Sequence, residues 1–555
     1  MNDIQIAQAA TLKPIAEIAR EYQIPDEALM SFGPHIAKVN PVKLRGLPQK
    51  GKLVLVSAIT PTTAGEGKTT VSISLADGLR AIGKKSMLAL REPSMGPVFG
   101  MKGGATGGGH SQVLPMENIN LHFTGDFHAI TSANNLLCAM VDNHIQQGNQ
   151  LNIDERQVRV RRCMDMNDRQ LRHMVNGLGG TGNGTPREDG FDITAASEVM
   201  ASFCMASDLT DLKKRLANIV VARDRSGKNI TCGQIGAQGA MAAMLRDAMM
   251  PNLVQTLDHT PALIHGGPFA NIAHGCNSIV ATQLALQLSD YVVTEAGFGA
   301  DLGAEKFIDI KCRASGLRPD CVVLVATIRA LKHHGGVLKD DLNTENIPAL
   351  KVGLENLLAH IRNVRTVWNL PVVVAINHFI TDSQAEIDTL QSAMDQEGVL
   401  CRFSDGWAKG GEGAKELAAA VAELVDGKDK PELTFTYPSD MPLTEKIEAI
   451  AKKVYHAGSV NFSAQAKKIL AQLTEDGFSN YPVCIAKTQY SFSDNAKLLG
   501  APSGFELTIR DARLSGGAGF VVAFAGDIIA MPGLPKAPAA LKVDVDENGV
   551  ISGIF

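Results

Sequence analysis

The residues best suited to chemistry in this chain stand close together near position 65. Gly65, Gly67, Lys68 and Thr69 lie within the stretch 60–70. Glycines let backbone N–H groups turn toward an anion, a lysine reaches the β- and γ-phosphate oxygens of a nucleotide, and a hydroxyl ligates Mg²⁺. The pattern predicts a phosphate-binding loop whose candidate ATP contacts are Thr62, Thr63, Ala64, Gly65, Glu66, Gly67, Lys68 and Thr69.

Two segments with different periods flank this loop. Residues 53–59 form a short apolar, β-branched run that is typical of a buried strand, and residues 68–82 carry apolar side chains at helical spacing. Strand, glycine loop and helix is the context that a phosphate loop requires, and the helix start adds partial positive charge. The usual pattern has glycine five residues before Gly67, where this chain has Thr62. A glycine turn that merely joins strand to helix is therefore the alternative.

Further buried strands are predicted at residues 87–90, 291–294, 321–327 and 371–377. Because helical stretches separate them, they predict an α/β fold like that of P-loop NTPases, with a mainly parallel sheet, helices on both faces and smaller α/β domains added. The expected division is a nucleotide-binding domain at 1–360, a second α/β domain at 361–430 and a C-terminal α/β domain at 431–555. Residues 1–48 are expected to be a helical lead-in, and Asn548-Gly549 predicts a terminal hairpin rather than a calcium loop.

Two charged residues directly follow predicted strands, at the edge where parallel sheets bind ligands. Arg91 follows residues 87–90 and could face the phosphates held by Lys68, although a surface arginine paired with an acid is the simpler alternative. Glu295 follows residues 291–294, and an acid in this position can hold Mg²⁺ directly or through water. Many strands end in an acid, so the alternative is that Glu295 has no role in metal binding.

A glycine-rich stretch and two histidines have more than one interpretation. Residues 103–109 contain five glycines, which excludes a stable helix and predicts a lid or an anion-binding nest, with a flexible linker as the alternative.

His122, Asp126 and His128 could serve acid–base chemistry or tie down a loop, and no metal is assigned to them. The roles of these two histidines and of His110 stay open.

Trp407 lies in a polar, glycine-rich segment, residues 404–413. An aromatic side chain in such a loop can provide a platform for a planar ligand, whereas a buried anchor is the usual role of a tryptophan. The residues after the strand at 371–377 lack the Asn-Lys-x-Asp pattern of a guanine pocket, which favours adenine.

Bulk properties exclude several classes of protein. The net charge of -5 gives no electrostatic support for nucleic-acid binding. No run of 18 apolar residues occurs, so we expect no membrane-spanning segment, and the first residues lack the pattern of a secretory signal. The nine cysteines form no C-x-x-C pair, which is typical of reduced thiols in a cytoplasmic protein.

Taken together, these motifs resemble the formate–tetrahydrofolate ligases (10-formyltetrahydrofolate synthetases), along essentially the whole chain. Three stretches carry the resemblance most specifically: residues 60–70, 101–110 and 325–336. Further matches lie at 115–126, 295–306, 487–493 and 531–535. Three positions differ from the residues common in the family: Thr63 replaces a proline, Thr106 an alanine and His110 a tyrosine. The glycines and the lysine of the loop are unchanged.

The resemblance implies ATP-dependent ligation of formate to tetrahydrofolate through formyl phosphate, which gives 10-formyltetrahydrofolate, ADP and phosphate in one-carbon metabolism. It also implies that Arg91 clamps formyl phosphate beside the catalytic Lys68, that Phe379 and Trp407 enclose the pterin, and that Mg²⁺ accompanies ATP. A homotetramer and a response to monovalent cations are further implications.

Two other functions remain open for a phosphate loop in this context. A switch or partitioning ATPase should show a basic patch, an amphipathic tail or a second lysine early in the loop, and none is evident in the sequence. Another ATP-dependent carboxylate ligase would share the loop but not the aromatic pair Phe379 and Trp407, because only a flat acceptor needs it.

Overall fold

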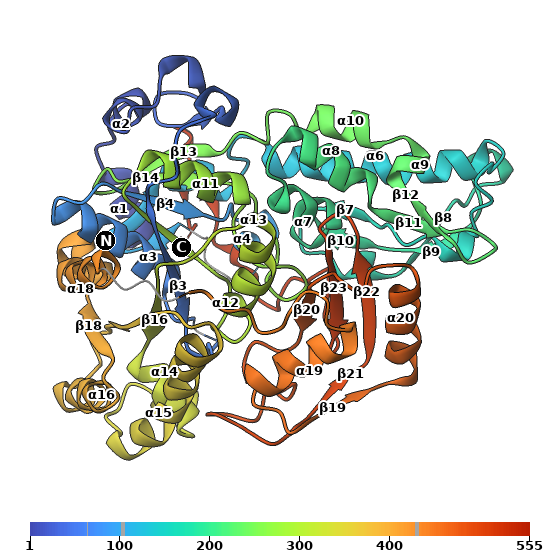
Figure 1. Cartoon of the computed structure of the whole chain (residues 1–555). Helices are drawn as coiled ribbons and strands as arrows, with labels where there is room; N and C mark the ends of the chain where they lie inside the picture. The colour runs from blue at the N-terminus through green and yellow to red at the C-terminus, as the bar shows by residue number, and fades with distance from the viewer. Residues whose placement is uncertain (64, 101–105, 428–431, 555) are drawn as a thin grey trace.

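The computed structural model describes residues 1–63, 65–100, 106–427 and 432–554. One large sheet runs through the part of the molecule drawn at the left of Figure 1. Its strands are β1 (Leu29–Ser31), β2 (Ala37–Val39), β3 (Lys52–Ala58), β4 (Ser86–Leu90), β5 (Gly107–Gly108), β6 (Ser111–Leu114), β13 (Asn252–Thr256), β14 (Pro261–Ile264), β15 (Tyr291–Glu295), β16 (Cys321–Ala326), β17 (Val372–Asn377) and β18 (Leu400–Ser404).

Most of this sheet is parallel. Within the described residues ten strands follow the order β1-β2-β13-β14-β4-β15-β3-β16-β17-β18, and β5 and β6 attach beside β13. From β14 to β18 every neighbouring pair is parallel. The carboxyl ends of these seven strands therefore meet at one edge of the sheet, which we call the carboxyl edge. The predicted mainly parallel α/β fold is confirmed.

Helices cover both faces because the central strands are apolar on both sides. In β3, Leu53 and Leu55 belong to a buried cluster that includes α11 (Ile279–Leu288) and α15 (Ile347–Arg362). Val54 and Val56 point the other way, into a cluster with α3 (Lys68–Ala81) and α18 (Lys415–Asp426). The continuous apolar runs in the sequence thus reflect a sheet covered on both faces.

The N-terminal segment is only partly the predicted helical lead-in. It contains α1 (Asp3–Ala9) and α2 (Ile15–Glu21), and Ile15, Ile18 and Ala19 are buried on one face of α2 as expected. It also contains β1 and β2, which extend the sheet beside β13. These strands were not predicted, because three residues are too few to show a period of two.

Residues 126–250 form a unit of their own, which we call the middle unit and which lies at the upper right of Figure 1. A separate buried cluster holds most of it together. Its helices are α6 (Asp126–Gln146), α7 (Glu198–Met205), α8 (Leu209–Ala217), α9 (Cys232–Ile235) and α10 (Gln238–Met244). Its strand pairs are β7 (Arg162–Met164) with β10 (Phe191–Ile193), β8 (Met174–Asn176) with β9 (Arg187–Asp189), and β11 (Val220–Arg223) with β12 (Asn229–Thr231).

Residues 443–525 form a second small α/β unit, the C-terminal unit, at the lower right of Figure 1. It contains α19 (Leu443–Lys453), α20 (Ala464–Glu475), the parallel pair β19 (Ser459–Phe462) and β21 (Glu506–Ile509), and a sheet of β20 (Val483–Ala486), β23 (Phe520–Phe524) and β22 (Asp511–Ser515). Strands β17 and β18, from residues 361–430, extend the central sheet. The domain borders at 360 and 430 stay predictions.

The chain ends close to where it begins. β24 (Asp544–Val545) and β25 (Ile551–Ser552) form the predicted terminal hairpin, in which the Asp546 N–H donates to Val550 O at 3.0 Å. Ile554 then packs with Ile4 and Ala7 of α1. Among the described residues, no helix combines the length and the apolar character needed to cross a membrane.

Candidate functional site

The predicted phosphate loop joins β3 to α3 at the carboxyl edge. Gly65 and Gly67 have φ values of 80° and 70°, a region that favours glycine, and Gly67 is the N-cap of α3. A Cβ atom on Gly67 would lie 2.3 Å from Asn377 Nδ2, so a side chain there is excluded by contact as well as by φ. The loop therefore needs glycine at position 67. Ala64 lies outside the described residues.

Glu66 turns its side chain inward and ties the loop to two neighbouring strands. Glu66 Oε1 accepts hydrogen bonds from the Thr62 N–H at 2.8 Å and the Thr62 hydroxyl at 3.0 Å. Its Oε2 accepts from the Thr327 hydroxyl, just past β16, at 2.5 Å. Asn377 Nδ2, at the end of β17, donates to Glu66 O at 3.0 Å. The buried carboxylate thus holds the loop in shape, which leaves the backbone of Glu66 as the part that could contact phosphate.

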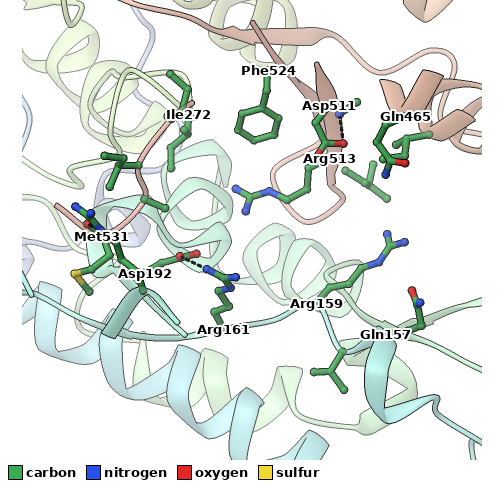
Figure 2. Close-up of a pocket in the computed structure, with 18 of the residues that line it drawn as sticks. Gln157, Arg159, Arg161, Asp192, Ile272, Gln465, Asp511, Arg513, Phe524 and Met531 are labelled. Atoms are coloured by element: carbon green, nitrogen blue, oxygen red, sulfur yellow. Dashed lines mark hydrogen bonds and ion pairs between the residues drawn. The ribbon is translucent and has the colours of Figure 1, made fainter. Parts of the chain in front are cut away.

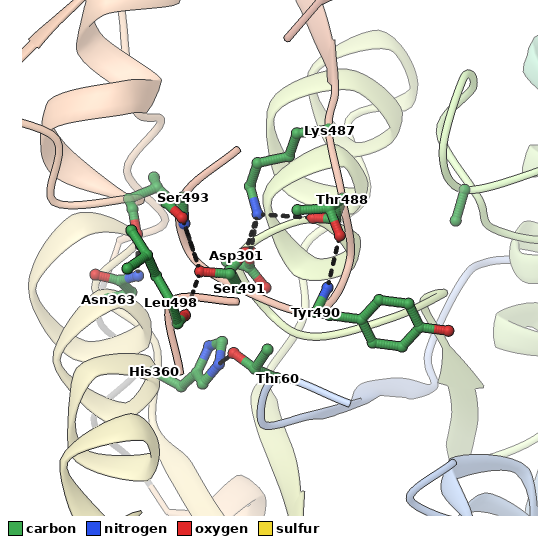
Figure 3. Close-up of polar contacts among 12 residues, drawn as sticks. Thr60, Asp301, His360, Asn363, Lys487, Thr488, Tyr490, Ser491, Ser493 and Leu498 are labelled. Atoms are coloured by element: carbon green, nitrogen blue, oxygen red, sulfur yellow. Dashed lines mark hydrogen bonds and ion pairs between the residues drawn. The ribbon is translucent and has the colours of Figure 1, made fainter. Parts of the chain in front are cut away.

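The entry to the loop, at Thr60, is held from α14 (Ile328–His334) and α15. Asn356 Nδ2 donates to Thr60 Oγ1 at 3.0 Å, and His360 Nε2 lies 3.1 Å from the same oxygen (Figure 3). His334 Nδ1 accepts from the Gly500 N–H, so its Nε2 carries the proton that it donates to Thr60 O at 2.8 Å. Burial lowers the pKa of His334, and lowers that of His360 to about 3, so both rings are neutral.

The C-terminal unit is held against this side of the site by a buried ion pair. Lys487 Nζ lies 2.8 Å from Asp301 Oδ2, and both side chains are fully buried. Lys487 also donates to Ser491 O at 2.5 Å (Figure 3). Asp301 follows β15 by six residues, so this pair links the segment after Glu295 to the C-terminal unit.

Thr69 and Glu295, the two predicted Mg²⁺ ligands, are in direct contact. Thr69 lies in the first turn of α3, and Glu295 is the last residue of β15, which pairs with β3. The Thr69 hydroxyl donates to Glu295 Oε2 at 2.9 Å. Mg²⁺ bound with a nucleotide typically takes one or two protein oxygens and completes its shell with phosphate and water. These two oxygens fit that pattern beside the loop.

Arg91 lies on the other side of β15, directly after β4. Its Nη1 donates to Pro268 O at 3.4 Å, and its buried Nε has no hydrogen-bond partner within the described chain. A Cβ atom on Gly297 would lie 3.4 Å from the same Nη1, so the guanidinium sits beside the segment that follows Glu295. The site thus brings a cation with unused donors close to the predicted metal ligands.

The residues around Asp126 do not form a metal site. Asp126 makes a buried ion pair with Lys38, with Nζ 2.7 Å from Oδ1. Burial, followed by the charge of Asp126, raises the pKa of the neighbouring Glu92 carboxyl well above its usual range. His122 and His128 are exposed, as is His110. Across residues that the structure describes, no group of three or more His, Cys, Asp or Glu side chains is arranged to hold a metal ion.

Phe379 and Trp407 follow β17 and β18, at the same edge of the sheet. The Arg329 guanidinium carbon lies 3.6 Å from the centre of the Phe379 ring, so one face of that ring is covered. Trp407, in α17 (Gly406–Lys409), is 54% exposed. Sequence analysis did not single out Arg329, although it lies in the stretch 325–336, two residues after the helix cap Thr327.

The end of the glycine-rich stretch lies directly on Trp407. The His110 N–H donates to Trp407 O at 2.8 Å, and a Cβ atom on Gly109 would be 2.8 Å from Trp407 Cγ. Gly109 therefore permits a close approach that no larger residue allows. Residues 101–105, the first half of the stretch, lie outside the described residues, so the predicted lid or anion nest is placed only in part.

Comparisons with known proteins agree with the sequence motifs. The family model described as formate–tetrahydrofolate ligase matches residues 1–555. Two curated relatives of that name, from Methylorubrum populi and Methylobacterium nodulans, are each 58% identical to this chain over 560 residues. Each match covers 100% of both proteins, so the relatives share the whole chain and not one domain of it.

Proposed function

The chain belongs to the formate–tetrahydrofolate ligase family and catalyses the ATP-dependent formylation of tetrahydrofolate, and from this premise we propose that the reaction proceeds through formyl phosphate at the carboxyl edge. In this proposal Lys68 and the loop amides hold the γ-phosphate. Arg91 binds formate and then formyl phosphate, and Phe379 and Trp407 hold the pterin.

The chemistry explains why these residue types are needed. Formate is a poor electrophile because its carboxylate carries a full negative charge. A formate oxygen attacks the γ-phosphorus, the bond to the β–γ bridging oxygen breaks, and ADP leaves. The folate N10 then attacks the formyl carbon, the carbon–oxygen bond to phosphate breaks, and N10 loses its proton. Both steps depend mainly on holding anions together and stabilising the spreading charge.

The observation that carries the proposal is the arrangement of Arg91 and Glu295 at two adjacent strand ends with Thr69, in the first turn of the helix that follows the next strand, β3. The strand order β4-β15-β3 places them side by side, and the Thr69–Glu295 hydrogen bond joins two of them. Thr69 and Glu295 would hold Mg²⁺, which offsets charge on the phosphates when it is bound with ATP. The planar fork of Arg91 suits an acyl phosphate better than a lysine ammonium would.

The acceptor side is supported by the exposed indole of Trp407 and by the position of Phe379 on the neighbouring strand end. Formyl phosphate hydrolyses readily, so the pocket must exclude water once the substrates are bound. Gly109 and His110, the described end of the glycine-rich stretch, contact Trp407 and could cover the pterin there. The contact that covers the pterin would then also position N10 for its attack on the formyl carbon.

The experiment measures ADP release by the purified protein with formate and tetrahydrofolate supplied separately and together. We expect sustained release only when both are present, and ¹⁸O from labelled formate should appear in the released phosphate at one atom per turnover. The same rate of ADP release without formate would support a switch ATPase instead. Phosphate without label would exclude formyl phosphate while leaving the overall ligation intact.

Three further parts of the proposal concern the setting of the enzyme and rest on the family alone. We propose a homotetramer, a response to monovalent cations, and a place in the cytoplasm among small-molecule substrates with no nucleic acid. Light scattering should give a mass about four times the 59.0 kDa of one chain. Activity in potassium should exceed activity in tetramethylammonium at equal ionic strength.

A further inference from the structure

A cavity lies between the middle unit and the C-terminal unit, away from the residues of the proposed active site. Its volume is about 810 Å³, within the range of small-molecule sites. Its walls come from residues 157–192 and Arg223 of the middle unit, residues 465–473 of α20, and residues 511–531. None of Lys68, Arg91, Glu295, Phe379 and Trp407 lines it. We call it the arginine cavity (Figure 2).

The charge of the arginine cavity is strongly one-sided. Only two carboxylates line it, those of Asp192 and Asp511, which leaves an excess of four positive charges. The lining cations are Arg159, Arg161, Arg172, Arg223, Arg513 and Lys468.

Three of the six cations are occupied by partners within the protein. Arg161 lies 3.9 Å from Asp192, and Arg223 lies 3.4 Å from Asp476, which is outside the cavity lining. Arg172 Nε donates to Met531 O at 2.9 Å. These contacts fix part of the wall but use only some of the guanidinium donors.

The other three cations are not satisfied by the protein. Within the described chain, Arg159, Lys468 and Arg513 form no ion pair and no hydrogen bond through their side chains. Arg513 approaches the Phe524 ring, at 5.9 Å, and its charge opposes the rise that burial causes in the pKa of Asp192 and of Glu198. Figure 2 shows Arg513 reaching into the cavity from the strand side and Arg159 rising from the opposite wall, while Arg161 points to Asp192. Guanidinium groups that face each other across a cavity are arranged to share an anion between them.

Part of the remaining lining is apolar, with Phe524, Leu514 and Ile528 on the strand side and Ile469 from α20. Polar side chains complete it: Gln157, His173, Gln465 and Gln472. A fully hydrated inorganic ion would leave the apolar surfaces unused. We propose that the arginine cavity binds a small organic polyanion, with at least two phosphate or carboxylate groups held by Arg159, Arg513 and Lys468 and an apolar or aromatic body against Phe524. Such a ligand would bridge the middle and C-terminal units.

Phosphate-bearing and carboxylate-bearing molecules share this chemistry, so the test uses one probe of each kind. Isothermal titration calorimetry measures the binding of inorganic tripolyphosphate, and separately of 4-aminobenzoyl-tri-γ-glutamate, to the full-length protein with MgADP at saturating concentration. We expect at least one probe to bind the natural protein with one site per chain. The tighter probe identifies the source of the anion.

The variant that tests the location is Arg159→Gln/Arg513→Gln, and we expect it to bind the tighter probe at least tenfold more weakly. Arg510→Gln is the matched control because Arg510 directly precedes β22, is exposed and pairs with exposed Asp527 at 3.3 Å, but does not line the cavity. It should bind as the natural protein does. Circular dichroism and the thermal midpoint without ligand establish that all variants fold.

Three outcomes would overturn the proposal. The first is no binding of either probe to the natural protein. The second is equal binding by the natural protein and the double variant, which would place the anion elsewhere. The third is a change in subunit number, seen by light scattering, with anion binding unaltered, which would make this face a contact between copies of the chain.

Discussion

The carboxyl edge and the arginine cavity both gather charged groups, but they hold them in different ways. At the carboxyl edge Glu66, Thr60 and Glu295 are each fixed by short hydrogen bonds from neighbouring strand ends or helices. In the arginine cavity Arg159 and Arg513 project from exposed positions with no ion-pair partner in the described chain. One region is organised before any ligand arrives, and the other becomes organised only when an anion joins its cations.

This difference matches what each region has to do. A site that stabilises a transition state must have its dipoles and charges in place beforehand, because reorganising them would raise the barrier. A site that only binds can order its side chains on binding, at about 0.5–1.5 kcal/mol for each immobilised side chain.

Lys68→Ala should lower kcat by about 10³-fold or more, because the transferring phosphoryl group loses its closest cation. The fold should be unchanged, as checked by circular dichroism. Lys467→Ala, at an exposed position on α20, is the control and should keep full activity. Normal turnover in Lys68→Ala would remove the phosphate loop from the mechanism.

Arg91→Lys should lower kcat by about 10²-fold, since a lysine keeps the charge but not the fork that grips two oxygens. ATP affinity, measured by equilibrium dialysis, should stay within a factor of two because Lys68 and the loop amides are intact. If the kinetics do not change, Arg91 does not contact formyl phosphate.

Trp407→Ala should raise the KM for tetrahydrofolate about tenfold or more, because aromatic stacking is worth about 1–3 kcal/mol. The KM for ATP should not change. The matched control is the other tryptophan, Trp368, which is buried and donates to Thr436 Oγ1 at 3.1 Å. Trp368→Phe should lower the thermal midpoint without altering either KM. An equal rise of both KM values in Trp407→Ala would count against stacking.

Glu66→Gln should weaken ATP binding and lower stability by about 1–3 kcal/mol, because one of the inward-facing oxygens becomes an N–H group opposite a donor. A double-mutant cycle with Thr327→Val measures the coupling free energy between the two side chains, which we expect to be about 1 kcal/mol. Additive effects of the two substitutions would show that the loop is not braced through β16.

The Arg159→Gln/Arg513→Gln variant should leave kcat for formylation within a factor of two and stability within about 0.5 kcal/mol, since it removes exposed cations that have no protein partner. Thermal unfolding and the ligase assay check both values. A large loss of activity would mean that the arginine cavity and the carboxyl edge are parts of one functional site.

Much of the carboxyl edge was predictable because its signals are local. The apolar runs that became β3, β4, β15, β16 and β17 are each readable within ten residues, and the start of α3 at Lys68 follows from the glycines before it. The positions of Arg91, Glu295 and Phe379 at strand ends follow from the same runs, whereas Trp407 follows β18, a strand that was not predicted. Their roles in the reaction remain predictions that the variants above test.

Local sequence patterns were enough to predict the parallel α/β class, the strand–loop–helix unit around Lys68, and the motifs that indicate the family. Only the tertiary structure decided that Glu66 bonds Thr327, that Thr69 meets Glu295, that Arg329 covers Phe379, and that the arginine cavity exists. The physical reason is range. Periodicity and turn chemistry act between residues a few positions apart, whereas these contacts join segments tens to hundreds of positions apart, which pack together only when the whole chain folds.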